Sequence, residues 1–283
     1  MSTGILFDAP GPLTAARHRV YSVVTIVVLV AVAALVVWRL QVNDQFTNKK
    51  WVVFSDADFV RAILVDGLVQ TLKMAFTAVI GAVVFGFVLG VGKMSQHRWV
   101  RWPSWLVVEF FRAVPVLLLM VFVWYALGIK NPGSSYWGVV IALTLYNGSV
   151  LAEVLRAGVN AVPKGQAEAA YAIGMRKSQV MGIVMLPQAV KIMLPAIISQ
   201  CVVALKDTAL GSYILAPGLT AVSKEIYLEF NNRVPTMIVT AALYISINLL
   251  LTWLATWAQK RYVGEKKILE VSMVGETEQP RGA

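Results

Sequence analysis

The chain has 283 residues, of which 58% are apolar and only 14% are charged. Soluble domains carry about 25% charged residues, so this composition excludes an ordinary soluble fold and indicates an integral membrane protein. The single cysteine excludes an internal disulfide framework, and the net charge of +10 lies beside apolar runs, where a membrane-orientation signal explains it better than nucleic-acid binding.

Six stretches are apolar and long enough to cross a bilayer, which takes about 20 residues. We predict spans at roughly 20–40, 68–92, 105–128, 136–159, 185–205 and 234–258. The first stretch is too long for the apolar core of a cleaved signal peptide, so we expect it to be retained. The sequence therefore predicts an all-α integral membrane protein with six transmembrane helices.

Glycines recur along the second predicted span, where Gly86 and Gly90 form a G-x-x-x-G pair. Such a pair lets a neighbouring helix backbone approach closely. We expect packing inside the chain's own bundle, and a dedicated dimer contact is the alternative.

Basic residues indicate the orientation of the spans. They collect before the first span, in the loops 93–104 and 160–182, and after the sixth span, whereas the loop 129–135 carries only Lys130. Six crossings place all four basic clusters on one side, which the positive-inside rule makes the cytoplasm. We therefore predict a cytoplasmic segment 1–19, a cytoplasmic tail 261–283 and both termini inside.

Residues 206–233 are apolar in their middle but too short to span, and Pro217-Gly218 interrupts them. This pattern predicts a short outer-surface or re-entrant helix at about 208–215.

A polar-to-mixed segment at 168–187 lies between two apolar runs on the predicted cytoplasmic side. Pro163, just before this segment, marks the start of a helix, and Gly174, within the segment, marks its end. Four residues within that helix follow i, i+3, i+4, i+7 spacing: Gln166, Ala169, Ala170 and Ile173. They predict a narrow face suited to a groove on another protein, and the alternative is an ordinary connector lying on the membrane.

The same segment carries a family signature. Its E-A-A at Glu168, with Gly174 and Leu186-Pro187 in register, resembles the EAA loop of ABC importer permeases. Three further segments resemble the polar amino acid branch (histidine/glutamine/glutamate-type, type I): Glu109 to Pro115, Ala152 to Gly158 and Leu205 to Leu210. The likeness covers about 66–260, so the helix at 20–40 would be added to a five-helix core. Ala113-Val114 departs from the Gly-Thr that members often have.

The resemblance implies a permease subunit in a bacterial cell (inner) membrane, working with ABC ATPase subunits, a second permease (the same or a homologous chain) and an extracellular solute-binding protein. The loop 160–187 would couple to the ATPase through six residues: Gln166, Glu168, Ala169, Ala170, Ile173 and Gly174. The cargo would be a polar amino acid. Glutamate or another acidic amino acid is preferred because glutamate importers are prominent in this branch, while glutamine and basic amino acids stay open.

The chain carries no G-x-x-x-x-G-K-[ST] phosphate loop, and Lys164-Gly165 lacks both its glycine spacing and its Ser/Thr. We therefore expect no cofactor on this chain and no enzyme activity of its own, with ATP and magnesium held by the partner ATPase. His18 and His97 are isolated, so no metal site is predicted.

Interior charges form two pairs at i, i+3 spacing: Glu109 with Arg112, and Glu153 with Arg156. The predicted topology puts both pairs near the cytoplasmic surface. We expect an inner ionic network beside the translocation path, and a fixed brace that never opens is the alternative.

Candidate residues of the substrate path are Asn147, Gln200, Lys206 and Asp207. Buried polar groups are costly in hydrocarbon and should face the bundle interior. An adjacent lysine and aspartate could bind the carboxylate and the ammonium of an amino acid. They could equally cap a helix at the membrane surface.

Two other function classes compete with an ABC permease. An ion-gradient-driven secondary amino acid transporter would need no ATPase, and its 160–182 loop would be a mere connector. A non-transporting scaffold would give no reason for the interior glutamates and arginines.

Overall fold

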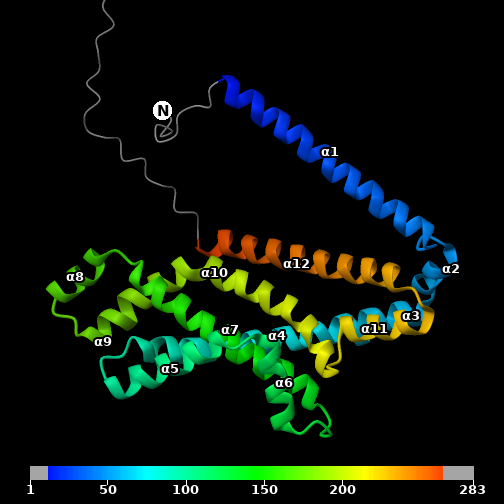
Figure 1. Cartoon of the computed structure of the whole chain (residues 1–283). Helices are drawn as coiled ribbons and strands as arrows, with labels where there is room; N and C mark the ends of the chain where they lie inside the picture. Colours follow the sequence, from blue (N-terminus) through cyan, green and yellow to red (C-terminus); the bar gives the residue numbers. More distant parts are fainter. Residues whose placement is uncertain (1–11, 264–283) are drawn as a thin grey trace, which may run out of the picture. The chain divides into compact units, whose positions relative to one another are not determined.

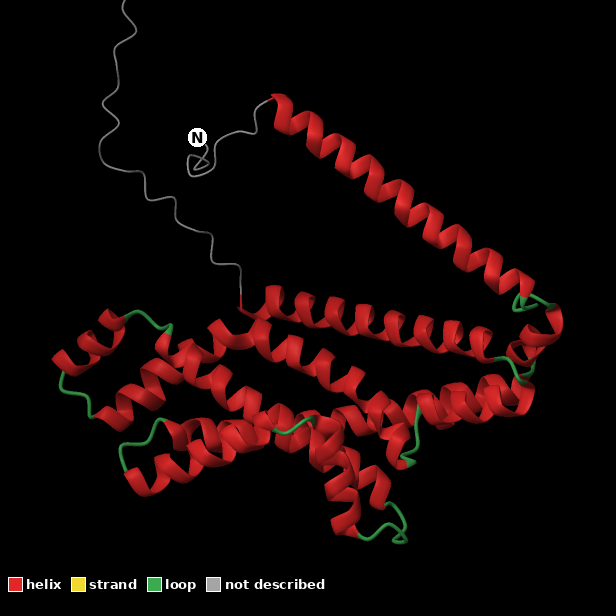
Figure 2. Cartoon of the chain, viewed as in Figure 1, coloured by secondary structure: helices red, strands yellow, loops and turns green. Residues whose placement is uncertain are grey.

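The computed structural model describes residues 12–263, in which loops and turns join helices and no strand occurs (Figure 2). The all-α fold class is confirmed. The predicted end segments 1–19 and 261–283 lie largely outside the described residues. The described residues divide into two compact units, one made of 12–61 with 223–239 and the other of 62–222 with 240–263.

Within residues 12–263, five helical stretches are long and apolar enough to cross a membrane, or six if one bent pair counts as a span. The unbroken ones are Arg17–Val42 within α1 (Pro12–Val42), Ala57–Lys93, α7 (Ser134–Asn160), Lys177–Ile214 and Arg233–Trp257 within α12 (Arg233–Val263). The second joins α3 (Ala57–Arg61), a π-helical stretch (Ala62–Val69) and α4 (Gln70–Lys93). Five of the six predicted stretches, all but 105–128, thus correspond to one unbroken stretch each (Figure 1).

The third predicted span, 105–128, is wrong as a single straight helix. It consists of α5 (Arg98–Ala113) and α6 (Val116–Leu127), which meet at a bend of 106°. Proline disfavours helical backbone in the residue before it, and Val114 accordingly is extended with ψ 128. Pro115 therefore ends α5 and starts α6.

The fifth predicted span, 185–205, starts too late. Helical structure begins with α9 (Lys177–Gln179), continues through a π-helical turn (Val180–Met185) and enters α10 (Leu186–Asp207). A proline ring clashes with the preceding turn of a regular α-helix, and here the wider π turn lies directly before Pro187. The helical structure therefore continues through Pro187 without a break.

Shorter helices differ from expectation in part. The predicted helix at 208–215 is present as a 3₁₀ helix, Thr208–Ile214. The sequence analysis missed α11 (Leu219–Phe230), α2 (Asn48–Trp51) and a 3₁₀ turn (Val52–Ser55). In the smaller unit, the buried Asn232 donates its Nδ2 hydrogen to the Lys50 carbonyl at 3.1 Å, which ties two distant segments together.

The core of the larger unit is the contact between α4 and α7. A Cβ on Gly86 would lie 2.7 Å from the Gly148 carbonyl oxygen, and one on Gly90 would lie 2.8 Å from Leu155 Cδ2. The G-x-x-x-G pair therefore packs within the chain, as expected. α6 also lies against α7, and Met74, Met120 and Leu143 fill the space around them.

Candidate functional site

The predicted coupling helix is present as α8 (Lys164–Ala172), in the connection between α7 and α10. Pro163 precedes it with φ −55 and ψ 131, and Gly174 follows it with φ +82. The Met175 amide donates to the Ala170 carbonyl at 3.2 Å, and the Gly174 amide donates to the Tyr171 carbonyl at 2.9 Å. These two bonds make a Schellman motif, which needs the left-handed backbone that glycine adopts freely.

Some of the predicted coupling residues of α8 contact the rest of the chain, and others are exposed. Ala170 is buried within the chain, and the Gln188 amide donates to Gln166 Oε1 at 3.3 Å. Glu168, Ala169 and Ile173 are exposed, and the side chain of Ile173 is 79% accessible. The predicted four-residue stripe is therefore not one free face, because Ala170 packs inward. Instead, the large apolar side chain of Ile173, at the end of the polar helix α8, is exposed and accessible to a partner.

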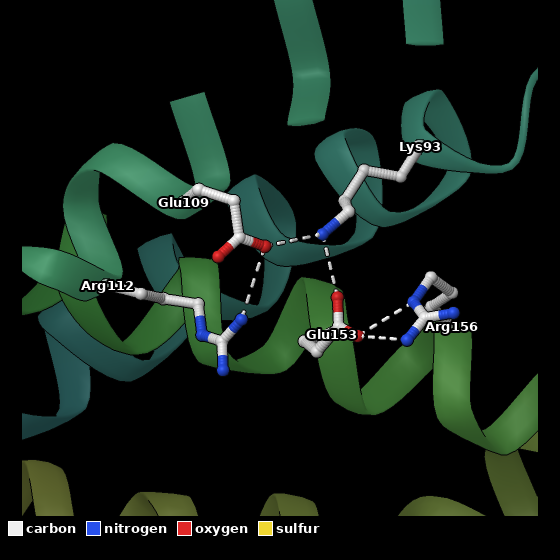
Figure 3. Close-up of polar contacts among 5 residues, drawn as sticks. All are labelled: Lys93, Glu109, Arg112, Glu153 and Arg156. Carbon is white, nitrogen blue, oxygen red and sulfur yellow. Dashed lines mark hydrogen bonds and ion pairs between the residues drawn. The ribbon is translucent and has the colours of Figure 1, made fainter. Parts of the chain in front are cut away.

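A second feature is the cluster of charged side chains from α4, α5 and α7 (Figure 3). Arg112 Nη1 lies 3.4 Å from Glu109 Oε1, and Arg156 donates from Nε and Nη2 to Glu153 Oε1. Both predicted i, i+3 pairs are therefore in contact.

Lys93, the last residue of α4, joins these two pairs and was missed as a site residue by the sequence analysis. Its Nζ lies 3.2 Å from Glu109 Oε1 and 2.7 Å from Glu153 Oε2, and its side chain is only 5% exposed (Figure 3). Read along the chain, Lys93 is one more basic loop residue. Its place at the end of a long apolar helix was a signal in the sequence, but the two acids that it contacts lie on other helices.

The five residues form what we call the charge cluster: Lys93, Glu109, Arg112, Glu153 and Arg156. It holds three cations and two anions, so each carboxylate has two basic neighbours. Four of the five, all but Arg112, line a hollow of about 330 Å³ together with residues of α5. Lys93 is the buried member and contacts both carboxylates, so its loss would remove two contacts from the cluster at once.

The charge cluster and α8 lie at the same end of the bundle. Met94, next to Lys93, packs with Met181 and Met185 of the π turn against Val159, Val162 and Ala189. α8 in turn contacts that π turn. A displacement of α8 would therefore reach the charge cluster through a short, packed route.

The four candidate substrate residues do not form one site, although two of them are in contact. Gln200 donates from Nε2 to Asn147 Oδ1 at 2.5 Å, and Asn147 Nδ2 donates to the Leu143 carbonyl at 3.0 Å. Asn147 is buried, and this bond joins α7 to α10. Nearby on α7, the buried Ser149 hydroxyl has no partner among the described residues.

Lys206 and Asp207 lie at the far end of α10 from α8. They form no ion pair with any described residue; Lys206 is exposed and Asp207 is half-buried. At 1.5 Å per residue, Lys206 is about 9 Å along the helix from Gln200. The polar pair at Asn147 and the charged pair thus lie at different depths.

Comparison with known proteins gives consistent matches. The profile of the family described as "Binding-protein-dependent transport system inner membrane component" matches residues 82–264. The glutamate transport system permease protein GluD of Corynebacterium glutamicum is 41% identical over 228 residues, or 77% of this chain and 82% of that protein. The arginine transport system permease protein ArtQ of Bacillus subtilis is 30% identical over 203 residues, or 70% and 91%. A solved amino acid ABC transporter, crystallised with histidines, shares 29% identity with a TM-score of 0.68 over 74% of this chain and 97% of that one.

Proposed function

This chain belongs to the family of binding-protein-dependent transport system inner membrane components, and we propose that it is the permease subunit of an ATP-driven amino acid importer, most readily one for glutamate. The observation that carries the proposal is α8. It is a separate helix between two long apolar helices, and it presents an exposed isoleucine at its end. Its place within the family match supports a contact with an ATPase.

The residues of the chain indicate which steps of transport would fall to this subunit and which to its partners. The sequence holds no phosphate loop, so ATP and magnesium would bind to ATPase subunits beside α8. A solute-binding protein would deliver the amino acid at the opposite face, and a second permease would complete the path. Nucleotide state would bias a bundle with two arrangements through α8, the π turn and the charge cluster.

The coupling proposal is tested by association. Ile173→Asp places a charge where an apolar contact is proposed, so the ATPase should no longer co-purify with the permease. Tyr213→Asp is the matched control, because Tyr213 is 72% exposed on the 3₁₀ helix after α10. Its complex should survive. Equal loss in both variants, or retention in both, would contradict docking at α8.

The cargo proposal rests on relatives, since GluD is named for glutamate and ArtQ for arginine. Uptake of labelled glutamate should disappear when the gene is deleted and return when the chain is restored. Excess aspartate should compete better than arginine. Preferential inhibition by arginine or glutamine would reassign the cargo within the family. Uptake that survives inactivation of the ATPase would instead favour an ion-gradient-driven transporter.

A further inference from the structure

The first two turns of α5 read R-W-V-R-W-P-S-W from Arg98, and Arg101, Trp102 and Trp105 of this motif also line the hollow beside the charge cluster. Three of the nine tryptophans of the chain fall within these eight residues. Trp99, Trp102 and Trp105 are 92%, 65% and 46% exposed. Such exposure of the largest apolar side chain needs a partner surface.

The two arginines of the motif are free for an anionic partner. Arg98 and Arg101 form no ion pair with any described residue. The nearby acids, Glu109 and Glu153, are already paired with Lys93, Arg112 and Arg156. Positive charge at this end therefore exceeds the acids available to neutralise it.

The exposed face changes in character along α5. Arg98, Trp99, Arg101 and Trp102 together with Pro103 line a hollow of about 630 Å³. One and two turns further on, the exposed residues are Leu106 and Phe110. From Trp102 to Phe110 the helix rises about 12 Å. Arginine and tryptophan side chains are typical of the headgroup region of a membrane, and leucine and phenylalanine are typical of its hydrocarbon core. The exposed face of α5 changes from the first kind to the second along the helix.

We propose that the first two turns of α5 bind the anionic phospholipid headgroups of the cytoplasmic leaflet. The arginines contact the phosphate, and the tryptophan rings lie at the boundary with the acyl chains. Met94, four residues before Arg98, packs beside the π turn that α8 contacts, so the site lies at the coupling end of the bundle. Lipid binding here anchors α5 next to the charge cluster. The inference is independent of the cargo.

Titration of the full-length chain in neutral detergent tests the proposal. The probes are dioctanoyl phosphatidylglycerol, dioctanoyl phosphatidylcholine and inorganic phosphate, with bound molecules counted by native mass spectrometry. The wild type should prefer phosphatidylglycerol. Each basic residue near an anionic surface contributes about fivefold in affinity, so Arg98→Gln/Arg101→Gln should weaken that binding by about five- to 25-fold. Its unfolding temperature should stay unchanged, because neither arginine is paired.

Lys130→Gln/Lys224→Gln removes the same charge from exposed positions outside α5 and should keep wild-type lipid affinity. Equal weakening in this control would reduce the effect to net charge and overturn a site on α5. Equal affinity for the two lipids would also overturn it. So would phosphate binding as tight as phosphatidylglycerol, which would mark a free-anion site.

A second copy of the chain is the rival occupant of this face. In a Cys201→Ser background, Trp99→Cys in native membranes should react with a lipid-phase maleimide and form no crosslinked dimer. A disulfide dimer at this position would show that another permease, and not lipid, covers the face, and would overturn the proposal.

Discussion

Lys93 is a single buried cation that joins three helices, because its side chain on α4 contacts Glu109 on α5 and Glu153 on α7. It is the only contact between the Glu109–Arg112 pair and the Glu153–Arg156 pair among the recorded ion pairs of the described residues. Its partners lie 16 and 60 residues away in the sequence. Sequence reasoning found the two pairs because each is local, and it missed the bridge because nothing local indicates which helices meet.

Lys93→Met keeps the length of the side chain but leaves two carboxylates facing each other without their shared cation. Because Arg112 and Arg156 still neutralise the two carboxylates, we expect a loss of about 1.5–3 kcal/mol in unfolding free energy, the usual worth of a hydrogen bond to a charged group. Lys93→Arg should retain most of the stability. Denaturant titration in detergent measures both, and a stable Lys93→Met protein would contradict the bridging role.

The same variant separates a gate from a brace. If the charge cluster opens during transport, the Lys93→Met protein that remains folded should hydrolyse ATP without matching uptake. If the cluster is a fixed brace, uptake per folded molecule should equal that of the wild type. Assays of ATPase and uptake on equal amounts of folded complex distinguish the two.

Gly174 is needed at the end of α8 because of its backbone conformation and not because of close packing. A Cβ there would meet nothing within 4 Å, so only its φ of +82 opposes a side chain. Gly174→Ala should therefore cost about 1–2 kcal/mol, the strain of a left-handed alanine. Gly165 also has open space and lies inside the helix, so Gly165→Ala should be neutral or slightly stabilising. Thermal unfolding compares them, and equal destabilisation would refute the argument from backbone strain.

At the scale of elements, local sequence signals predicted where helices end better than they predicted the angles between helices. Pro163 and Gly174 gave the bounds of α8, because a proline before a helix and a glycine after it act through their own backbone. Pro115 is equally local, yet the sequence could not tell a mild kink from the 106° bend between α5 and α6. That angle depends on what α5 packs against, namely α4 and α7.

The α4–α7 contact can be tested through its glycines. Gly86→Ala would place a Cβ 2.7 Å from a backbone oxygen of α7, which cannot move aside as a side chain can. We expect a destabilisation of about 1–3 kcal/mol, the usual cost of overpacking a core. Gly182→Ala, where a Cβ meets nothing within 4 Å, is the matched control and should change stability by less than about 0.5 kcal/mol. Chemical denaturation of both variants measures the difference, and a fully tolerated Gly86→Ala would show that the two helices can separate freely.

At the scale of the whole molecule, the two loops beside the ends of α7 should lie on opposite sides of the membrane. Met94, in the loop 93–104, packs with Val159 at the end of α7, whereas Lys130 precedes the start of α7 at Ser134. The 27 residues of α7 make a helix of about 40 Å, enough to cross the hydrocarbon core. The basic loop 93–104 should then face the cytoplasm, with α8, and the loop 129–135 should face outward.

Single cysteines in a Cys201→Ser background test this arrangement. A membrane-impermeant maleimide should label Lys130→Cys in intact cells, and should label Gln96→Cys only after the membrane is opened. The positive-inside rule requires this result, because basic residues near the membrane are retained on the cytoplasmic face. The opposite labelling pattern would put α8 outside, out of reach of any ATPase, and would remove the basis of the importer mechanism even though the fold and family would stand.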